Sequence, residues 1–353
     1  MVSRRKFIKT CLAAAGLTAL GGLGLRGRAN SLAAGGAREP EQGARVEPRP
    51  AANGTGLRYL ELEQSGELER RERALWAMME NCSLCPRMCG VNRMAGRMGI
   101  CSTDQTFRVA SAGPHFGEER TLVGRGGSGT IFFSNCNLLC IFCQNWQIAH
   151  RGDGRTMTHA QLASEMLSLQ RRGCHNINFV TPTHLVPHIV SAVRLAIPQG
   201  LNVPLLYNTS GYETMEVMQL LDGIIDIYLP DFKYQDSEVA MRLSNGAPDY
   251  VRHTAAAIKE MHRQVGTLQM TDGVATRGLI IRHLVMPGNL AGTDVFVRWV
   301  VNELGADTHV NIMAQFFPAF QARNHPPLDR RINQGEWDQA MRWARDAGLR
   351  NFH

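Results

Sequence analysis

The chain has 353 residues, of which 44% are hydrophobic, enough to bury a full core in one large α/β barrel or in two smaller domains. Its net charge of +7 comes from the first 34 residues, which carry six basic residues and no acidic one and leave 32 basic against 31 acidic residues elsewhere. The remainder is nearly neutral, so the charge gives no support for binding to nucleic acid or to a membrane surface.

Residues 1–34 match the twin-arginine export pattern, with Arg4 and Arg5 followed by an apolar stretch from Cys11 to Leu25. That stretch is about 15 residues long, too short for a stable transmembrane span. We therefore predict a signal peptide that takes the folded protein through the twin-arginine translocase to the periplasm. An uncleaved leader would instead leave the chain tethered to the membrane or in the cytoplasm.

Residues 35–57 are rich in Gly, Ala, Pro, Arg and Glu and have no periodicity, which predicts a flexible linker. The segment 58–125 begins with an amphipathic helix that runs to about residue 79. It continues into a cysteine-rich module at residues 82–101.

A repeated strand-then-helix pattern predicts a barrel domain at residues 126–320, followed by a helical segment at 321–353. Short apolar runs closed by polar, Gly or Pro residues are typical of buried parallel strands. The candidate strands are Thr130–Phe133, Ile177–Val180, Pro204–Asn208, Ile224–Leu229, Leu279–His283 and Val310–Met313. Six such units with right-handed crossovers predict an α/β sheet that curls toward an incomplete barrel. An open doubly wound sheet is the alternative topology.

Three cysteines, Cys136, Cys140 and Cys143, follow the first candidate strand with the spacing C-x3-C-x2-C. A cubane iron–sulfur cluster normally takes four thiolates, so three in one loop leave one iron free to bind another molecule. This pattern favours a catalytic [4Fe-4S] cluster. Zinc would require a fourth ligand that nothing adjacent supplies, and buried thiols or disulfides are the remaining alternatives.

The cysteine spacing, with Phe142 before the last cysteine, resembles the signature of the radical S-adenosylmethionine (radical SAM) superfamily. The resemblance implies a partial (β/α)6 TIM-like radical SAM barrel, here with an N-terminal cysteine-rich module and an export leader. It further implies that S-adenosylmethionine chelates the free iron and is reductively cleaved to a 5′-deoxyadenosyl radical, which abstracts hydrogen from a substrate.

Residues 80–320 also resemble the activating enzymes of glycyl radical enzymes, of the pyruvate formate-lyase activase type. Three segments, at 82–89, 117–119 and 127–134, are similar to an uncharacterised branch of that group. The resemblance implies that cofactor contacts come from residues behind several strands: Asn145, Asn208, Thr209, Ser210, Asp231, Lys233 and Arg282.

Asp231 and Lys233 suit such a role chemically, because a carboxylate can accept hydrogen bonds from ribose hydroxyls and an ammonium can meet the methionine carboxylate. An ordinary ion pair is the alternative for both residues and for Arg282. For Thr209 and Ser210 the alternative is that they only shape a glycine turn. His184 and His283 also follow strands, but a lone histidine is usually structural.

Two motifs depart from the group. Thr181-Pro182-Thr183-His184 replaces the Gly-Gly-Glu that binds the methionine amino group, so the hydroxyls of Thr181 or Thr183 would have to substitute. Asn208 stands where the group has an aspartate, which puts a bound cation there in doubt.

Cys82, Cys85, Cys89 and Cys101 form a second group that is large enough to close a metal site. Four thiolates suit a second iron–sulfur cluster or zinc, with disulfides and free thiols as further alternatives. A cluster could relay electrons to the first site, whereas zinc would staple the module. Cys174 is alone and is expected to be buried.

We therefore predict a radical SAM enzyme of the oxidoreductase or activating-enzyme type, which also needs an electron donor. Its substrate is unidentified; a glycine of a partner glycyl radical protein is one option. An exported iron–sulfur electron carrier or a structural metal-binding protein without catalysis is the alternative. Export conflicts with the activase option, because the known types of glycyl radical enzyme work in the cytoplasm.

Overall fold

The computed structural model describes residues 56–353. The predicted signal peptide at 1–34 and nearly all of the predicted linker at 35–57 therefore lie outside the described residues. Within the described part, no helix has both the length and the apolar character needed to cross a membrane.

Six parallel strands form the centre of the fold, and they are the six that the sequence predicts. They pair in chain order, so each helical crossover returns the chain to the next position in the sheet. The strands are β2 (Ser128–Phe133), β4 (Ile177–Val180), β5 (Leu205–Thr209), β6 (Ile227–Pro230), β8 (Val274–Leu284) and β9 (His309–Met313). Nearly every residue of β2, β4, β5 and β6 is buried, as expected of parallel strands covered on both faces. The predicted α/β architecture is confirmed.

Three further strands extend this sheet and were not predicted. The strand β1 (Arg108–His115) pairs antiparallel with β2, in a register from Val109 opposite Phe133 to His115 opposite Ser128. The short strands β3 (Arg155–Thr156) and β7 (Gln269–Thr271) pair antiparallel with β1 and β8. The segment 58–125 therefore contributes a strand to the sheet in addition to its helices and cysteines.

Helices alternate with the parallel strands, as the predicted strand-then-helix pattern requires. The longer ones are α2 (Arg58–Gln64), α3 (Glu67–Ala77), α6 (His159–Arg171), α7 (Val186–Ala196), α8 (Met215–Leu220), α9 (Ser237–Leu243), α10 (Tyr250–Val265), α11 (Thr293–Leu304) and α12 (Gln334–Asp346). Two single-turn helices are α4 (Arg120–Val123) and α5 (Trp146–Ala149). The sequence Thr158-x-x-Gln161 forms a capping box before α6: the Gln161 amide donates to Thr158 Oγ1 at 3.2 Å, and the Thr158 amide donates to Gln161 Oε1 at 2.9 Å.

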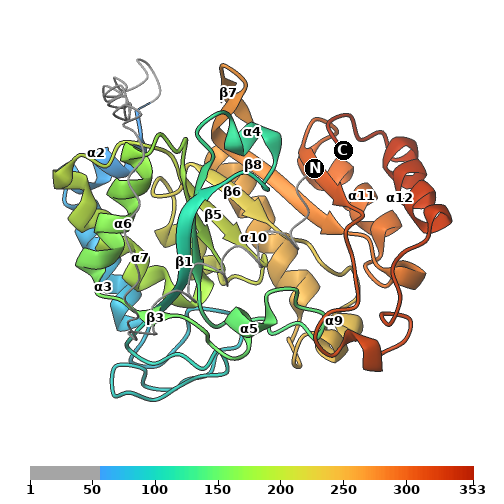
Figure 1. Cartoon of the computed structure of the whole chain (residues 1–353), viewed down its shortest axis with the longest axis horizontal. Coiled ribbons are helices and arrows are strands. Elements are labelled where there is room, and N and C mark those ends of the chain that lie inside the picture. The colour runs from blue at the N-terminus through green and yellow to red at the C-terminus, as the bar shows by residue number, and fades with distance from the viewer. Residues whose placement is uncertain (1–55) are drawn as a thin grey trace, which may run out of the picture. The chain divides into compact units, whose positions relative to one another are not determined.

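The loops behind the parallel strands collect at one edge of the sheet. In Figure 1 the cysteine module, α5 and α9 lie together at the lower edge, beyond the ends of the β4–β6 strands. Hydrogen bonds join these segments, including one from the amide of Ile141 to the carbonyl of Leu243 at 2.9 Å. Because parallel α/β folds carry their functional groups at the carboxyl edge, this is where the candidate site is built.

Candidate active site

The three predicted cluster ligands all lie in the loop that follows β2. Cys140 is buried, whereas Cys136 and Cys143 are half-buried. The amide of Leu138 donates to the sulfur of Cys136 at 3.3 Å, and the hydroxyl of Ser244 donates to the sulfur of Cys140 at 3.3 Å. Burial and then the neighbouring thiols raise the pKa of Cys136 to about 11 and that of Cys143 to about 12. The charge of Cys140 contributes to both shifts, so Cys140 lies close to the other two thiols.

A buried ion network lies behind β5, β6 and β8. Arg282 donates from Nε to Asp231 Oδ1 at 2.7 Å and from Nη2 to Asn208 Oδ1 at 2.5 Å. Its Nη1 lies 3.5 Å from Glu118 Oε2, a residue for which the sequence suggested no role in the site. Lys233 Nζ donates to the other carboxylate oxygen of Asp231. Burial opposes ionisation of Asp231, but the two cations hold its pKa at about 2, so the carboxylate is charged at neutral pH.

Lys233 connects this network to the cysteine loop. Burial works against its ammonium, but Asp231 and Cys140 together raise its pKa. The same ammonium partly offsets the raised pKa of Cys136 and of Cys143. One cation is therefore shared between a carboxylate and the three thiols, an arrangement that favours negative charge on sulfur.

A second buried cluster joins the ends of β4 and β5 around Glu213, which sequence reasoning missed. Its Oε1 accepts hydrogen bonds from Thr183 Oγ1 at 2.6 Å and from the hydroxyl of Thr209, and its Oε2 lies 3.3 Å from the Tyr207 hydroxyl. The two threonines are predicted site residues, and the structure brings them together on this carboxylate. The only signal in the sequence was an acidic residue soon after the Asn-Thr-Ser-Gly turn.

The other predicted contacts lie at the same edge. Thr181 has a φ of 60°, a strained conformation for a β-branched residue, and its amide donates to the carbonyl of Asn208 at 2.9 Å. The hydroxyl of Ser210 is buried and has no hydrogen-bond partner among the described residues. Asn145 is half-buried and directly precedes α5.

The two histidines have structural surroundings. His184 Nε2 lies 3.0 Å from the carbonyl of Ser134, and burial lowers its pKa to about 3. The ring of His283 stacks on Phe296 with centroids 4.1 Å apart and bonds to the Phe232 carbonyl and the Thr293 hydroxyl. Both side chains are therefore neutral parts of the core at physiological pH.

The second cysteine group is also gathered by the fold. Cys82, Cys85 and Cys101 are buried and Cys89 is half-buried, with the amide of Ile100 donating to the Cys89 sulfur at 3.5 Å. Burial raises the pKa of Cys85, and the charges of the other three thiols raise it further. In residues 56–353, no group of three or more His, Cys, Asp or Glu side chains is already spaced to hold a metal ion. The assignment of both cysteine groups therefore rests on their spacing, shared burial and N–H···S bonds.

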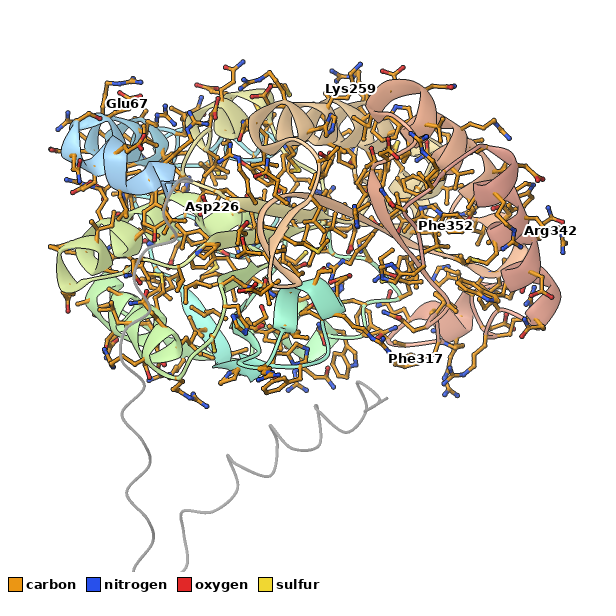
Figure 2. All side chains as sticks on the ribbon, turned by 90° about the horizontal axis from the view of Figure 1, so that it is seen from above. Glu67, Asp226, Lys259, Phe317, Arg342 and Phe352 are labelled. Atoms are coloured by element: carbon orange, nitrogen blue, oxygen red, sulfur yellow. The ribbon has the colours of Figure 1, made fainter. Side chains whose placement is uncertain are left out.

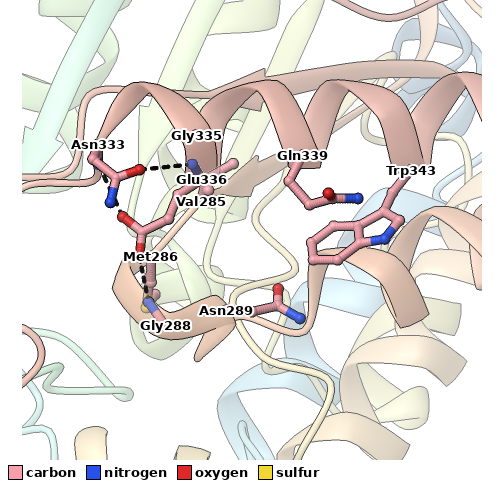
Figure 3. A pocket seen from close by; sticks show the side chains of 9 residues that line it. All are labelled: Val285, Met286, Gly288, Asn289, Asn333, Gly335, Glu336, Gln339 and Trp343. Atoms are coloured by element: carbon pink, nitrogen blue, oxygen red, sulfur yellow. Dashed lines mark hydrogen bonds between the residues drawn. The ribbon is translucent and has the colours of Figure 1, made fainter.

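A pocket of about 420 Å³ lies between the turn after β8 and α12, apart from the residues described above. Figure 3 shows Asn289, Gln339 and Trp343 facing this space. One end is fixed by Glu336, which accepts from the amide of Gly288 at 2.8 Å and belongs to the capping box of α12 with Asn333. None of the predicted site residues lines this pocket.

Glu213 gives the protein a pH-dependent stability that can be measured. Burial raises its pKa from 4.5 to about 7, although three hydroxyls donate to it. Between these values the folded state keeps a proton that the unfolded chain releases, so stability falls as the pH rises. In urea unfolding, we expect the free energy of unfolding of Glu213→Gln to exceed that of the wild type by less than about 1 kcal/mol at pH 5 and by about 3 kcal/mol at pH 8.

Glu216→Gln is the matched control, because that exposed carboxylate lies three residues further along. Its effect should be the same at both pH values. Asp226 follows the same trend as Glu213: it is buried, as Figure 2 shows in contrast to Lys259 and Arg342 at the surface, and burial raises its pKa to about 7. Glu213→Gln therefore removes only part of the wild-type pH dependence, and equal gains at pH 5 and pH 8 would contradict the assignment.

Comparisons with known proteins relate the chain to one family. The model of the Radical SAM superfamily matches residues 130–275. An uncharacterised protein of Methanocaldococcus jannaschii is 33% identical over 281 residues, which cover 77% of this chain and 76% of that protein. Among solved structures, methylornithine synthase is 14% identical with a TM-score of 0.41, over 84% of this chain and 80% of its own. Streptococcus suis SuiB is 13% identical with a TM-score of 0.40, over 62% of this chain and 47% of its own. From the matched family and the extended sequence similarity, the chain belongs to the radical SAM superfamily.

Proposed function

We propose that the protein is a radical SAM enzyme in which Cys136, Cys140 and Cys143 hold a [4Fe-4S] cluster. The observation that carries the proposal is the placement of Lys233 between this thiol loop and the half-buried Asp231 carboxylate. When bound, the cluster and S-adenosylmethionine supply a 5′-deoxyadenosyl radical for hydrogen abstraction.

The residues of the site fit that cofactor pair. The three thiols lie in one loop, and an amide and a hydroxyl donate hydrogen bonds to two of their sulfurs, which suits thiolate ligands. Asp231, held charged by two cations, can accept hydrogen bonds from the ribose hydroxyls. Lys233 and Arg282 supply positive charge for the methionine carboxylate.

The remaining contacts complete the binding site. Among the described residues, the Ser210 hydroxyl has no hydrogen-bond partner and the side-chain amide of Asn145 makes no cap hydrogen bond. Both groups can therefore donate a hydrogen bond to a polar ligand. Thr181, Thr183, Thr209 and Asn208 line the strand ends beside them. The buried Thr183 and Thr209 hydroxyls are already committed to Glu213, so their role is to shape the site around that carboxylate.

The substrate side of the proposal is broader. We propose hydrogen abstraction from a protein or small molecule, with a glycine of a partner glycyl radical protein as the activase option. We also propose that an external electron donor reduces the cluster.

We further propose a second iron–sulfur cluster or zinc on Cys82, Cys85, Cys89 and Cys101. Export through the twin-arginine translocase to the periplasm is also part of the proposal. Fractionation of cells for the mature chain tests the export.

The reaction class is tested with the full chain reconstituted anaerobically with iron and sulfide, reduced with dithionite and supplied with S-adenosylmethionine. We expect release of 5′-deoxyadenosine and methionine. A reducible cluster that yields no nucleoside would instead identify an electron carrier. Recovery of zinc as the sole metal would identify a structural metal-binding protein.

A further inference from the structure

One side chain of the cysteine module reaches directly into the radical SAM loop. Arg87 lies between Cys85 and Cys89 in the sequence. Its guanidinium donates to the carbonyls of Asn137 at 2.9 Å and Leu138 at 3.1 Å, the two residues that follow Cys136. These contacts span about 50 residues of chain, and they fix the backbone that presents the first predicted ligand.

The same guanidinium also holds the segment behind Cys140. It donates to the carbonyls of Ser244 at 2.8 Å and Asn245 at 2.7 Å, and the hydroxyl of Ser244 donates to the Cys140 sulfur. Arg87 is only 8% exposed and forms no salt bridge with another residue in 56–353, so its buried charge is met by four carbonyl dipoles. A planar guanidinium can serve several acceptors in one plane, whereas an ammonium cannot.

A second arginine of the module ties down the other end of the loop. Arg93 is fully buried and donates to the carbonyl of His184 at 2.8 Å. The ring of His184 in turn meets the carbonyl of Ser134, two residues before Cys136. The module is therefore hydrogen-bonded to the radical SAM loop on both sides of Cys136, directly through Arg87 and by way of His184 through Arg93.

The cysteines frame Arg87 within a tight turn. The amide of Cys82 bonds to the carbonyl of Val91 at 3.0 Å, and the amide of Gly90 bonds to the carbonyl of Cys82 at 3.1 Å. Met88 and Gly90 both have positive φ angles, of 44° and 67°. Such a turn in a non-glycine residue is strained, and metal ligation by the flanking cysteines is a physical means of holding it.

We propose that Cys82, Cys85, Cys89 and Cys101 bind one thiophilic metal centre, zinc or an iron–sulfur cluster, that fixes Arg87 and thereby the shape of the Cys136–Cys143 loop. This inference rests on the proposed function, since it assigns a role to the loop cluster. It makes Arg87 a positioning residue: it touches no ligand sulfur through its guanidinium and acts through the loop carbonyls.

Arg87→Gln tests the coupling, with Arg97→Gln as the matched control because Arg97 is an exposed arginine of the same module. We expect Arg87→Gln to keep the metal of the four-cysteine site and to hold the loop cluster roughly 10–100-fold less tightly, the usual cost of losing a partner that orients a ligand. Iron, sulfide and zinc are measured per chain during titration with a chelator. Equal retention of the loop cluster in the two variants would overturn the proposal.

Hydrogen–deuterium exchange of the amides at 134–145 gives a readout that needs neither activity nor a loaded loop. With zinc or iron at the four-cysteine site and the Cys136, Cys140 and Cys143 thiols replaced by alanine, exchange should be slow. It should become faster when the four cysteines of the module are also replaced by serine. Unchanged exchange would overturn the proposal, and circular dichroism of each variant separates loop loosening from global unfolding.

Metal analysis of the two sets of cysteine variants separates this inference from the proposed function. The module variant is analysed in the background in which Cys136, Cys140 and Cys143 are alanine, so that the loop cluster does not contribute to the metal content. In that background, loss of zinc identifies a zinc site and loss of iron and sulfide identifies a second cluster; either result supports the four-cysteine centre. A module variant that keeps the full metal content of that background would refute that centre. A loop variant that keeps its full iron content would refute the proposed function instead.

Discussion

Cys140→Ala is expected to remove the loop cluster and to abolish release of 5′-deoxyadenosine. Cys140 is the buried member of the three thiols. Its sulfur accepts a hydrogen bond from the Ser244 hydroxyl, and its charge raises the pKa of Lys233. Replacing a hydrogen-bond partner of a ligand already costs roughly 10–100-fold in metal affinity, and removing the ligand itself costs more. Iron and sulfide analysis after anaerobic reconstitution measures the loss.

Cys174→Ala is the matched control for this experiment. Cys174 is also buried, but it lies outside both cysteine groups and has no role in the proposed site. We expect this variant to retain the cluster and the full yield of nucleoside. If Cys140→Ala kept its iron content, or if Cys174→Ala lost it to the same extent, the assignment of the ligands would be wrong.

Asp231→Ala is expected to destabilise the protein by about 3–5 kcal/mol, because it leaves buried Arg282 and half-buried Lys233 without their shared carboxylate. Binding of S-adenosylmethionine, measured by equilibrium dialysis of the reconstituted protein, should weaken as well. The Asp231→Ala/Arg282→Met double variant should recover part of the stability, because it removes one of the two unpaired cations.

Asp307→Ala is the control for the loss of an ion pair. Asp307 pairs with Arg350 through side chains that are 61% and 65% exposed, so the change should cost less than about 1 kcal/mol. Urea unfolding of the variants in the same metal-loading state gives the comparison. Equal costs for Asp231→Ala and Asp307→Ala would show that the network behind β6 is not a buried, electrostatically coupled unit.

Features that depend on local patterns could be read from the sequence. The six parallel strands appear as short apolar runs, because burial on both faces requires nearly every residue to be apolar. The start of α6 was readable because the Thr158 capping box is formed within four consecutive residues. Asp231 and Lys233 were found because they lie two residues apart behind one strand.

Other features depend on pairings that no local pattern encodes. The strand β1 contains Gly113 and Pro114 and lacks a clean alternation of buried and exposed residues, so its pairing with β2 was not predicted. Glu213 is placed in the site by its hydrogen bond with Thr183, which lies 30 residues away in the sequence. The charge of an isolated Glu or Arg in a sequence does not tell whether the fold will bury it or which partners it will meet.

The sequence by itself determined the family, the spacing of Cys136, Cys140 and Cys143, and the strand ends at which the proposed site lies. Only the tertiary structure decided that Lys233 is shared between Asp231 and the thiols, and that Arg87 reaches carbonyls 50 and 158 residues away. The physical reason is that the spacing of cysteines within one loop depends only on residues that are neighbours in the sequence. Burial and the partners of a charge are instead fixed by chain segments that meet only in the folded protein.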